Sequence, residues 1–503
     1  MSTTEIFKKE IIKEILEKYR VIWALGHASS LMGWDSETYM PKQAYIDRGV
    51  ASSEISVLSR SLLLDKDFLS KLDRAKEVYE DLNDYEKGVI RVLDRAVKIY
   101  RALPEDLIKE MALTREEARA HWVQARYKSD YNIFKPYLAK NIELSIKAAE
   151  YLGYDIDRYD ALLDLFEEGL TYRKAKSILD EVASKIKPIF EKVYDEEIFP
   201  SKHPLEDVKY DIEAMKEINK EVLKLFNYPW DRARLDISAH PFTTGISLDD
   251  VRITTRYEGY DFRRTLYAVL HEYGHALYDL QIDPNFKYTP LEGGASLGIH
   301  ESQSRFWENI IGRSREFTEI LKPVLDEKLH FVRDYDVEEL YKYFNIVRPT
   351  YIRVDSDQLT YDLHIVLRFR MEHMFINGEL TVDDAPEIWN NTMEELLGIK
   401  PKRDSEGILQ DIHWSIGLMG YFPTYTLGNI LSAQIAYSME KKLGKISDLI
   451  IDSRFSDIQN YLKDEIHRYG GMYKPEELII RATGEDINPE YYIRYLRNKF
   501  LTQ

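Results

Sequence analysis

One short stretch limits what this chain can fold into more than any other: a His-Glu-x-x-His pattern inside a helical run from Tyr267 to Tyr278. His271 and His275 stand four positions apart, so on a helix they lie on one face, about one turn from each other. Glu272 is turned about 100° further around the axis and reaches the side of the same site. A catalytic zinc ion takes imidazole or carboxylate ligands and keeps one position open for water, which a neighbouring carboxylate deprotonates. We therefore predict a helix that carries two metal ligands and a general base.

The third metal ligand has to come from elsewhere, because the pattern alone also fits two ordinary helix histidines with an ion-pairing glutamate. Glu301 follows a glycine-rich turn (291–298) and falls on the next predicted helix. Two antiparallel helices joined by this turn would bring its carboxylate to the metal. His300 is a rival ligand, and because the two side chains face about 100° apart on a helix, we expect only one of them to bind the ion. A solvated carboxylate remains the alternative interpretation of Glu301.

If the activated water attacks a peptide bond, the site also requires a hydrogen-bond donor for the oxyanion that develops on the scissile carbonyl. Candidates cluster in the segments 407–414 and 420–425, where His413 and Tyr425 stand out. The alternative is a structural pair between His413 and Asp411 together with a buried core tyrosine, since the chain contains 36 tyrosines. The sequence leaves both interpretations open.

An enzyme that acts at the end of a peptide further requires a cation for the free α-carboxylate. Arginine suits this task because its planar fork binds a carboxylate at two points. Arg252, Arg348 and Arg353 lie in apolar or motif-rich surroundings and are the candidates. Each of them, taken alone, also fits a structural ion pair.

The composition excludes several classes of protein. The net charge of −18 argues against a general nucleic-acid binder, which needs clustered Lys and Arg. The absence of cysteine excludes disulfides and thiolate zinc sites and leaves His and carboxylates as metal ligands. The sequence shows no apolar signal core and no run of about 18 apolar residues, so we expect a cytoplasmic protein without a membrane anchor. Many Lys and Glu without Cys also fit a thermophilic source.

The periodicity predicts a mainly α fold. A helix is expected over 5–25, with Ser2 and Glu5 spaced as a capping box, and helical patterns dominate 45–150, 171–226 and the region after 298. Two extended segments within 228–260, joined by Gly245 to Asp249, are predicted to form one small antiparallel sheet beside the metal-binding helix. No low-complexity linker or repeat interrupts the chain. We predict one domain over 1–503, with a helical part (1–227) and a part that carries the metal site (228–503).

Taken together, these motifs resemble the carboxypeptidase Taq family of thermostable metallocarboxypeptidases, over nearly the whole chain. The matching segments, in chain order, are Trp34 to Pro41, His240 to Phe242, Asp250 to Thr254, His271 to His275, His300 to Gln303, Ile352 to Asp357 and Gly407 to Trp414. One departure is visible: Ser356 replaces the usual alanine of the sixth segment. Serine is small and leaves Arg353 and Asp357 in place.

The resemblance implies specific roles. His271, His275 and Glu301 would bind the metal, which in this family is zinc or cobalt, and Glu272 would be the general base and acid. The remaining motifs, with His240 and Gln303 among them, would line a substrate groove in which the arginines hold the carboxylate. Family members are two-lobed helical homodimers with a deep groove, which residues 1–227 would help to cover. They release single C-terminal residues from peptides with broad specificity.

Two other functions stay open. A zinc oligoendopeptidase uses the same chemistry but cuts inside a peptide. A helical binding protein with a structural metal, or none, is the alternative outside enzymes; a structural zinc site would be closed by four protein ligands.

Overall fold

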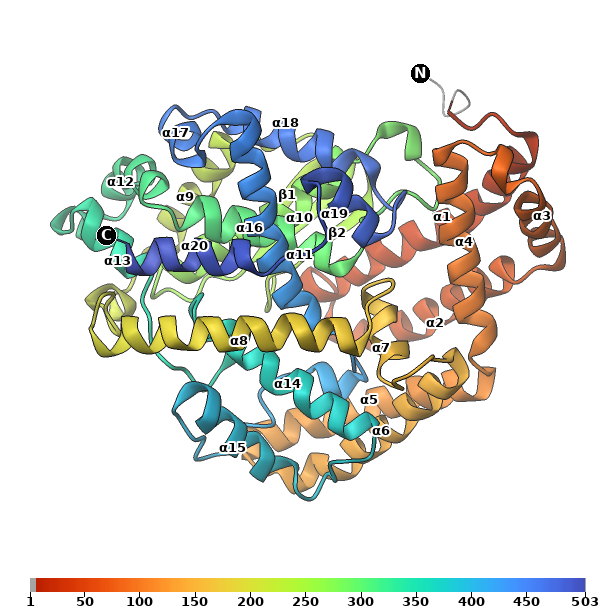
Figure 1. The fold of residues 1–503 in the computed structure, drawn as a ribbon, viewed down its shortest axis with the longest axis horizontal. Helices are drawn as coiled ribbons and strands as arrows, with labels where there is room; N and C mark the ends of the chain where they lie inside the picture. Colours follow the sequence, from red (N-terminus) through yellow and green to blue (C-terminus); the bar gives the residue numbers. More distant parts are fainter. Residues whose placement is uncertain (1–5, 503) are drawn as a thin grey trace. The chain divides into compact units, whose positions relative to one another are not determined.

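The computed structural model describes residues 6–502, and it is built almost entirely of helices (Figure 1). Within this range, the α-helices are α1 (Glu10–Thr38), α2 (Tyr45–Leu63), α3 (Lys66–Glu77), α4 (Asp84–Ala102), α5 (Glu105–Lys128), α6 (Tyr131–Leu152), α7 (Asp160–Phe166), α8 (Tyr172–Asp195), α9 (Ile212–Leu225), α10 (Arg263–Gln281), α11 (Leu297–Arg305), α12 (Arg315–Lys328), α13 (Val337–Phe344), α14 (Tyr361–Ile376), α15 (Ala385–Leu397), α16 (Pro423–Leu443), α17 (Ile446–Ile451), α18 (Phe455–Glu465), α19 (Pro475–Thr483) and α20 (Glu490–Leu501). The predicted mainly α fold is therefore confirmed. Among residues 6–502, no helix has the length and apolar composition needed to cross a membrane.

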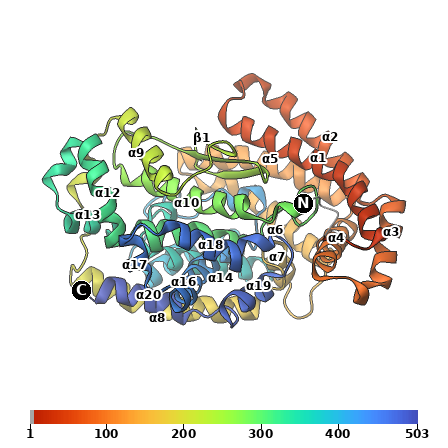
Figure 2. The same cartoon turned by 90° about the horizontal axis from the view of Figure 1, so that it is seen from above.

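The first helix is longer than the sequence pattern indicated. It begins at Glu10 and continues to Thr38, so that Trp34 of the first motif lies in its last turns. It packs beside α2, as Figure 2 shows. The capping box predicted at Ser2 and Glu5 lies outside the described residues.

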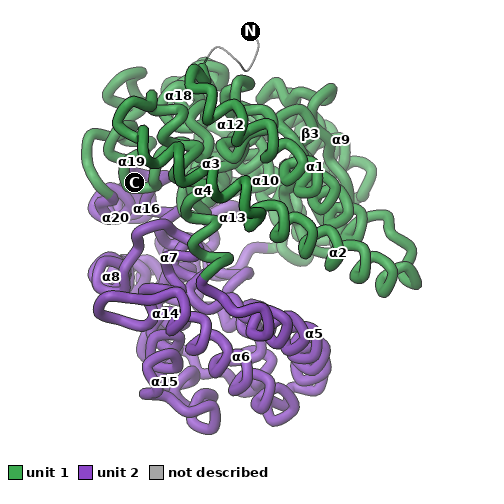
Figure 3. Tube along the Cα trace, turned by 90° about the vertical axis from the view of Figure 1, so that its right-hand side faces the viewer, with its two compact units in different colours: residues 1–101, 204–341, 435–486 green, residues 102–203, 342–434, 487–503 purple. Residues whose placement is uncertain are grey.

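The chain divides into two compact units, which Figure 3 distinguishes by colour. Unit 1 consists of the chain up to residue 101 with residues 204–341 and 435–486, and unit 2 of residues 102–203, 342–434 and 487–503. Each unit is thus assembled from three separate segments. The assignment of 1–503 to a single domain with a division at residue 227 stays a prediction.

The small sheet of unit 1 is mixed, not antiparallel as the sequence analysis expected. It contains β1 (Ala233–Ile237), β2 (Thr243–Ser247) and β3 (Asp250–Thr255) in the order β1-β3-β2. β2 pairs antiparallel with β3, whereas β1 pairs parallel with β3. The reason is that the residues around Gly245 form a strand of their own and fold back on β3 as a hairpin. β1 therefore pairs with the other edge of β3, in the same direction.

Helix α10 lies at the centre of unit 1, in contact with β2, β3 and α11. Its apolar face is buried: Leu266 and Leu270 have no exposed surface, and Tyr273 is 1% exposed. The Tyr273 ring stacks on Phe226 at a centroid distance of 4.9 Å and meets the edge of Trp307 at 5.0 Å. This core fixes the rotation of α10 about its axis, and so fixes the direction of its polar face.

Helices α10 and α11 approach closely at Gly274, inside the His-Glu-x-x-His pattern. A Cβ atom placed at Gly274 would lie 2.3 Å from the Gln303 carbonyl oxygen and 2.6 Å from the Ser304 Cα. Only glycine fits such a contact between two backbones. A mid-helix glycine costs about 1 kcal/mol relative to alanine, and here it allows the two helices to touch.

Candidate metal centre

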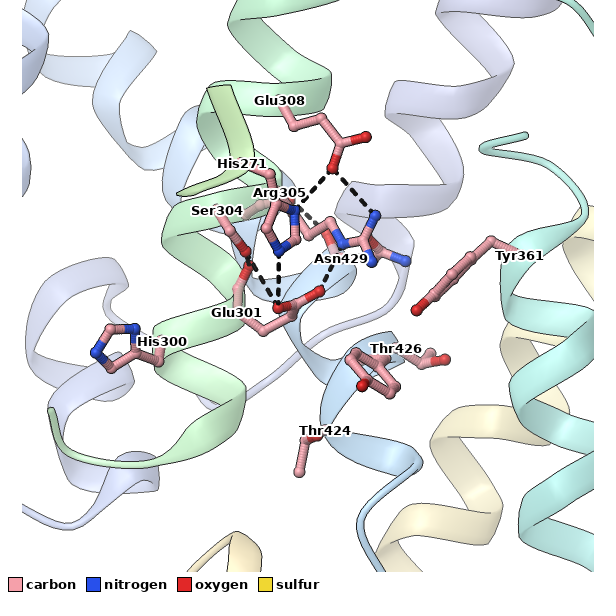
Figure 4. A network of polar contacts seen from close by, with 12 residues as sticks. His271, His300, Glu301, Ser304, Arg305, Glu308, Tyr361, Thr424, Thr426 and Asn429 are labelled. Atoms are coloured by element: carbon pink, nitrogen blue, oxygen red, sulfur yellow. Dashed lines mark hydrogen bonds and ion pairs between the residues drawn. The ribbon is translucent and has the colours of Figure 1, made fainter. Parts of the chain in front are cut away.

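Three side chains from two helices converge in unit 1. His271 and His275 project from α10 and Glu301 from α11, and their ligand atoms all lie within 4.8 Å of one another. Figure 4 shows Glu301 directed at His271. Glu301 Oε2 is 3.6 Å from His271 Nε2 and 3.4 Å from His275 Nε2. The sequence-predicted trio is therefore brought together.

The arrangement fits a tetrahedral divalent cation. Ligand atoms about 2.0–2.1 Å from zinc lie about 3.3 Å apart at the corners of a tetrahedron. The two measured contacts with Glu301 Oε2 are within a few tenths of an ångström of that value. Two imidazoles and one carboxylate also leave a fourth position open, which is typical of catalytic rather than structural zinc.

A second set of charges holds the ligands in place. His271 Nδ1 donates to Glu308 Oε2 at 2.9 Å, which leaves His271 Nε2 for the ion. Arg305 donates from Nε to Glu301 Oε1 at 2.7 Å and from Nη1 to Glu308 Oε2 at 3.2 Å. Glu308 lies in the π-helical segment Phe306–Gly312, which continues α11. The wider turn of this segment places Glu308 behind His271, three residues after Arg305.

These charges keep both carboxylates ionised. Burial raises the pKa of Glu301, but the positive charge of Arg305 and the neighbouring His271 outweigh it and hold the pKa well below its usual range. The pKa of Glu308 is likewise lowered against burial, chiefly by Arg305 and by the hydrogen bond from His271. Burial lowers the pKa of His275 to about 4, so its ring is neutral near pH 7 and able to bind a cation.

Glu272 lies beside the trio, with 6% of its surface exposed. Thr243, on strand β2, donates from its hydroxyl to Glu272 Oε2 at 2.6 Å. Burial raises the pKa of the Glu272 carboxyl above its ordinary value, and the Thr243 hydrogen bond opposes this shift. A raised carboxyl pKa suits a group that both accepts and returns a proton.

His300 is not part of the ligand trio. Its Nδ1 lies 2.8 Å from His275 Nδ1, and its Nε2 lies 3.1 Å from Asp279 Oδ1. It therefore stands behind His275 rather than facing the ligand atoms, and Figure 4 shows its ring apart from the contact between His271 and Glu301.

The other predicted residues of unit 1 have varied surroundings. His240 is exposed. Arg252 forms a two-point contact with Asp250, at 2.8 Å for each hydrogen bond, and its guanidinium lies 4.1 Å from the centroid of the Trp34 ring. Gln303 has no exposed surface, and its Oε1 lies 2.7 Å from His467 Nε2.

In unit 2, Arg353 belongs to a cluster of charged groups around the Asp411 carboxylate, which is largely shielded from solvent. Asp411 Oδ1 accepts from Arg353 Nε at 3.0 Å and Nη2 at 2.9 Å, while Asp411 Oδ2 accepts from Arg368 Nε at 2.6 Å. Arg353 also donates from Nη1 to the Tyr361 hydroxyl at 2.7 Å. Arg348 lies outside this cluster and donates from Nη1 to the Ser201 carbonyl at 3.0 Å.

His413 and Tyr425 contact each other in the same unit, with 3.2 Å between His413 Nε2 and the Tyr425 hydroxyl. Burial, and then the positive charge of Arg353, lower the pKa of His413 to about 3. The ring is therefore neutral near pH 7. Within residues 6–502, the buried Nδ1 of His413 has no hydrogen-bond partner.

Several residues around the trio were missed by the sequence analysis. Thr243, Asp279, Arg305 and Glu308 belong to no chemical pattern by themselves. Arg305 and Glu308 carried a usable signal, because Glu301 and Arg305 are spaced i, i+4 and Arg305 and Glu308 are spaced i, i+3 on one helical run.

Comparison with known proteins now defines the class of this one: it is a metallopeptidase. Residues 14–500 match the family described as carboxypeptidase Taq (M32) metallopeptidase, and the chain belongs to that family. It is a carboxypeptidase, a hydrolase that acts on peptides, and it uses a divalent metal. The resemblance inferred from the sequence motifs is confirmed.

Relatives match along essentially their full length. The chain is 51% identical to thermostable carboxypeptidase 1 of Pyrococcus furiosus, with 99% of this chain and 100% of the relative covered. It is 35% identical to carboxypeptidase 1 of Bacillus subtilis, with 97% of each chain covered. A solved structure of Pyrococcus furiosus carboxypeptidase superimposes with a TM-score of 0.98, at 51% identity, covering 99% of this chain and 100% of that one.

Proposed function

We propose that this enzyme hydrolyses the last peptide bond of its substrates and releases single amino acids with broad specificity. The observation that carries the proposal is the convergence of His271, His275 and Glu301 within 4.8 Å. Buried Glu272 stands next to them on the same helix as the two histidines. This combination supplies an open metal site and a general base in one place.

The donor set favours Zn²⁺, with Co²⁺ as a substitute, because both accept two imidazoles and a carboxylate in a tetrahedral arrangement. When bound, such a cation lowers the pKa of a coordinated water and polarises the scissile carbonyl. His271, His275 and Glu301 would hold it. Glu308 and Arg305 would keep the ligands oriented, since outer hydrogen bonds fix ring direction and ligand charge.

Glu272 is proposed as the general base and acid. Its carboxylate takes a proton from the attacking water and returns it to the leaving amine. Thr243 holds the carboxylate through the hydrogen bond to Oε2, which restricts its rotation. Burial raises the pKa of the Glu272 carboxyl above its ordinary value, which suits a group that both accepts and returns a proton.

In unit 2, we propose His413 or Tyr425 as the donor to the oxyanion. The neutral His413 ring can accept from Tyr425 at Nε2 and then carries its proton on Nδ1, the buried atom that lacks a partner among the described residues. A buried donor without a partner is costly unless a ligand engages it. This supports a role in binding the substrate.

Arg353 is proposed to hold the carboxylate of the substrate. The cluster around Asp411 contains two guanidinium groups, Arg353 and Arg368, and one carboxylate. Arg348 remains a second candidate. Arg252, paired with Asp250, and fully buried Gln303 are better suited to shaping the site than to touching substrate, and exposed His240 stays a candidate for substrate contact.

Three further properties stay predictions. We expect a cytoplasmic enzyme, a homodimer with a deep substrate groove, and thermal stability. The two rival functions are separated by one substrate comparison: an oligoendopeptidase would still cut a peptide whose C-terminus is amidated, and a binding protein would cut neither form.

The proposal is tested by Glu272→Gln, which keeps the shape and removes the base. We expect metal content equal to that of the wild type and a kcat at least about 100-fold lower, since general acid–base catalysis contributes that much. Metal is measured by elemental analysis and turnover by release of amino acids over time, with and without chelator. Activity near that of the wild type would contradict the assignment of Glu272.

A further inference from the structure

His300, the rival ligand of the sequence analysis, takes part in a chain of hydrogen bonds behind His275. Its Nδ1 lies 2.8 Å from His275 Nδ1 on α10, and its Nε2 lies 3.1 Å from Asp279 Oδ1, one turn further along the same helix. All three side chains belong to unit 1. We call Asp279, His300 and His275 the relay.

The chemistry of the three groups determines where the protons lie. A carboxylate only accepts hydrogen bonds, so Asp279 requires the proton of His300 on Nε2. A neutral His300 then has a lone pair on Nδ1 and accepts from His275. His275 consequently carries its proton on Nδ1. Its Nε2, which lies 3.4 Å from Glu301 Oε2, keeps the lone pair that a cation requires.

Two glycines leave the space that the relay occupies. A Cβ atom at Gly294 would lie 2.7 Å from His300 Cδ2 and 3.0 Å from Tyr278 Cε1. A Cβ atom at Gly245, on strand β2, would lie 2.9 Å from Asp279 Oδ2. The glycine-rich turn noted in the sequence is thus shaped around the His300 ring.

Tyr278 supports the same ring from the other helix. Its ring centroid is 4.9 Å from that of His300, and its hydroxyl accepts from the Ala295 backbone N–H at 3.0 Å, next to Gly294. The ring of His300 is therefore fixed by packing as well as by its two hydrogen bonds.

We propose that His300 and Asp279 are positioning residues that set the tautomer of His275, so that its Nε2 lone pair faces the bound cation. This inference rests on the proposed metal site at His271, His275 and Glu301. Outer hydrogen bonds to ligating histidines typically contribute about 10- to 100-fold to metal affinity. His300 and Asp279 therefore affect metal affinity and the tautomer of His275 in the apo-protein, and both can be measured without turnover.

Three substitutions test the two links. In Asp279→Asn, the amide donates to His300 Nε2, which moves the His300 proton to Nδ1 and the His275 proton to Nε2. In His300→Leu, His275 loses its partner, whereas His300→Asn keeps an acceptor oxygen near the position of Nδ1. We expect zinc affinity about 10- to 100-fold weaker for Asp279→Asn and His300→Leu, with partial recovery in His300→Asn.

Asp249→Asn is the matched control. It removes one carboxylate charge from the same unit, where Asp249 pairs with Arg232 and Lys287. We expect its zinc affinity to equal that of the wild type. If Asp249→Asn weakens zinc as much as Asp279→Asn, the loss is a general charge effect and the relay is wrong.

Zinc and cobalt dissociation constants are measured by competition with a chelator, and circular dichroism of each apo variant checks the fold. Should His300→Leu fail to fold, His300→Asn and Asp279→Asn carry the test. Nitrogen-15 NMR of histidine-labelled apo-protein reports the tautomer, and we expect the Nδ1–H form of His275 in the wild type and the Nε2–H form in Asp279→Asn.

Wild-type affinity in Asp279→Asn and His300→Leu would overturn the relay, as would an Nε2–H tautomer of His275 in the wild-type apo-protein. His275→Ala separates this failure from failure of the proposed function. If His275→Ala still binds one zinc per chain with the affinity of the wild type, the metal site itself is wrong. If it loses zinc while the relay variants keep it, only the relay is wrong.

Discussion

The hydroxyl of Thr243 donates a hydrogen bond to the carboxylate of Glu272 across 2.6 Å, and so joins strand β2 to helix α10 at the proposed general base. The contact depends on the hairpin that β2 forms with β3. The small sheet thus orients the side chain that we propose as the general base.

We predict that Thr243→Val lowers kcat by about 10- to 100-fold. A hydrogen bond to a charged group contributes about 1.5–3 kcal/mol, and valine keeps the shape of threonine without the donor. Steady-state kinetics on one peptide give kcat and KM, and KM is expected to change little. Thr244→Val, at the next position of the same strand, is the control. Equal kcat in both variants would show that the hydroxyl of Thr243 does not position Glu272.

Gly274→Ala is expected to separate α10 from α11. The new Cβ would lie 2.3 Å from the Gln303 carbonyl oxygen, a backbone atom that cannot move alone. We expect a loss of about 1–3 kcal/mol or more in the free energy of unfolding, because overpacking of a tight core contact typically costs about that much. Zinc affinity falls with it, since Glu301 is displaced from the two histidines.

Gly33→Ala is the control for that substitution. Gly33 lies in helix α1, and a Cβ atom placed there would have nothing within 4 Å. Alanine at this position should stabilise the protein by up to about 1 kcal/mol through helix propensity. Denaturant unfolding measures both variants, and a Gly274→Ala protein as stable as Gly33→Ala would contradict the close-contact argument.

Arg353→Ala is expected to reduce kcat/KM about 100-fold on peptides with a free C-terminal carboxylate. Two charged hydrogen bonds would be lost, at about 1.5–3 kcal/mol each before compensation. Any residual activity on C-terminally amidated peptides should change far less. Asp411 keeps its partner Arg368, so its carboxylate is not left unpaired.

Arg348→Ala is the comparison for Arg353. The arginine that holds the carboxylate is the one whose variant loses more kcat/KM on peptides with a free carboxylate than on amidated peptides. Equal losses on carboxylate and amide substrates in Arg353→Ala would argue that Arg353 is structural.

Stability is expected to fall as pH rises through the range in which Glu372 ionises. Burial raises the pKa of Glu372 to about 7, although Tyr159, Trp414 and the Gly420 N–H all donate to it. The folded state therefore holds this proton more tightly than the unfolded state does. The bound proton contributes roughly 3 kcal/mol to the free energy of unfolding. This contribution is fully present below about pH 4.5 and is lost as pH rises toward about 7.

Glu372→Gln should remove this part of the pH dependence. Denaturant unfolding between about pH 5 and about pH 8 gives the free energy of unfolding at each pH. Between these pH values, the free energy of unfolding should fall more for the wild type than for Glu372→Gln. This difference in slope does not depend on how far the substitution changes stability at a single pH. Glu394→Gln, which alters an exposed pair with Lys400, should follow the wild type. Parallel curves for Glu372→Gln and the wild type would disprove the raised pKa.

Part of the site could be predicted from the sequence because the signal was local. His271, Glu272 and His275 lie within five consecutive residues of one helix, and helical geometry alone places them on neighbouring faces. The same reasoning predicted Glu301 only as one of two rival ligands, the other being His300. The family motifs decided between it and His300, and the structure places Glu301 in the trio.

The buried partners of the site residues could not be predicted from the sequence, for a different reason. Gln303 belongs to a motif, yet it is buried against His467, far along the chain.

The sheet was predicted as antiparallel because the residues from Gly245 onward fitted a connection between two strands, and a glycine in a strand pattern does not indicate which strand it pairs with. The hydrophobic periodicity of a segment does not indicate contacts between residues that are far apart in the sequence.

The sequence by itself determined the helix that carries the His-Glu-x-x-His pattern, the mainly helical fold and the family, because each depends on spacing along the chain. Only the tertiary structure decided how Glu301 reaches His271 and His275. That contact requires two helix backbones to touch at Gly274, and the side chains of β2, α10 and the π-helical segment then supply Thr243, Asp279 and Glu308 around the site. The physical reason is that packing selects partners by shape and distance in space, which a linear order of residues does not specify.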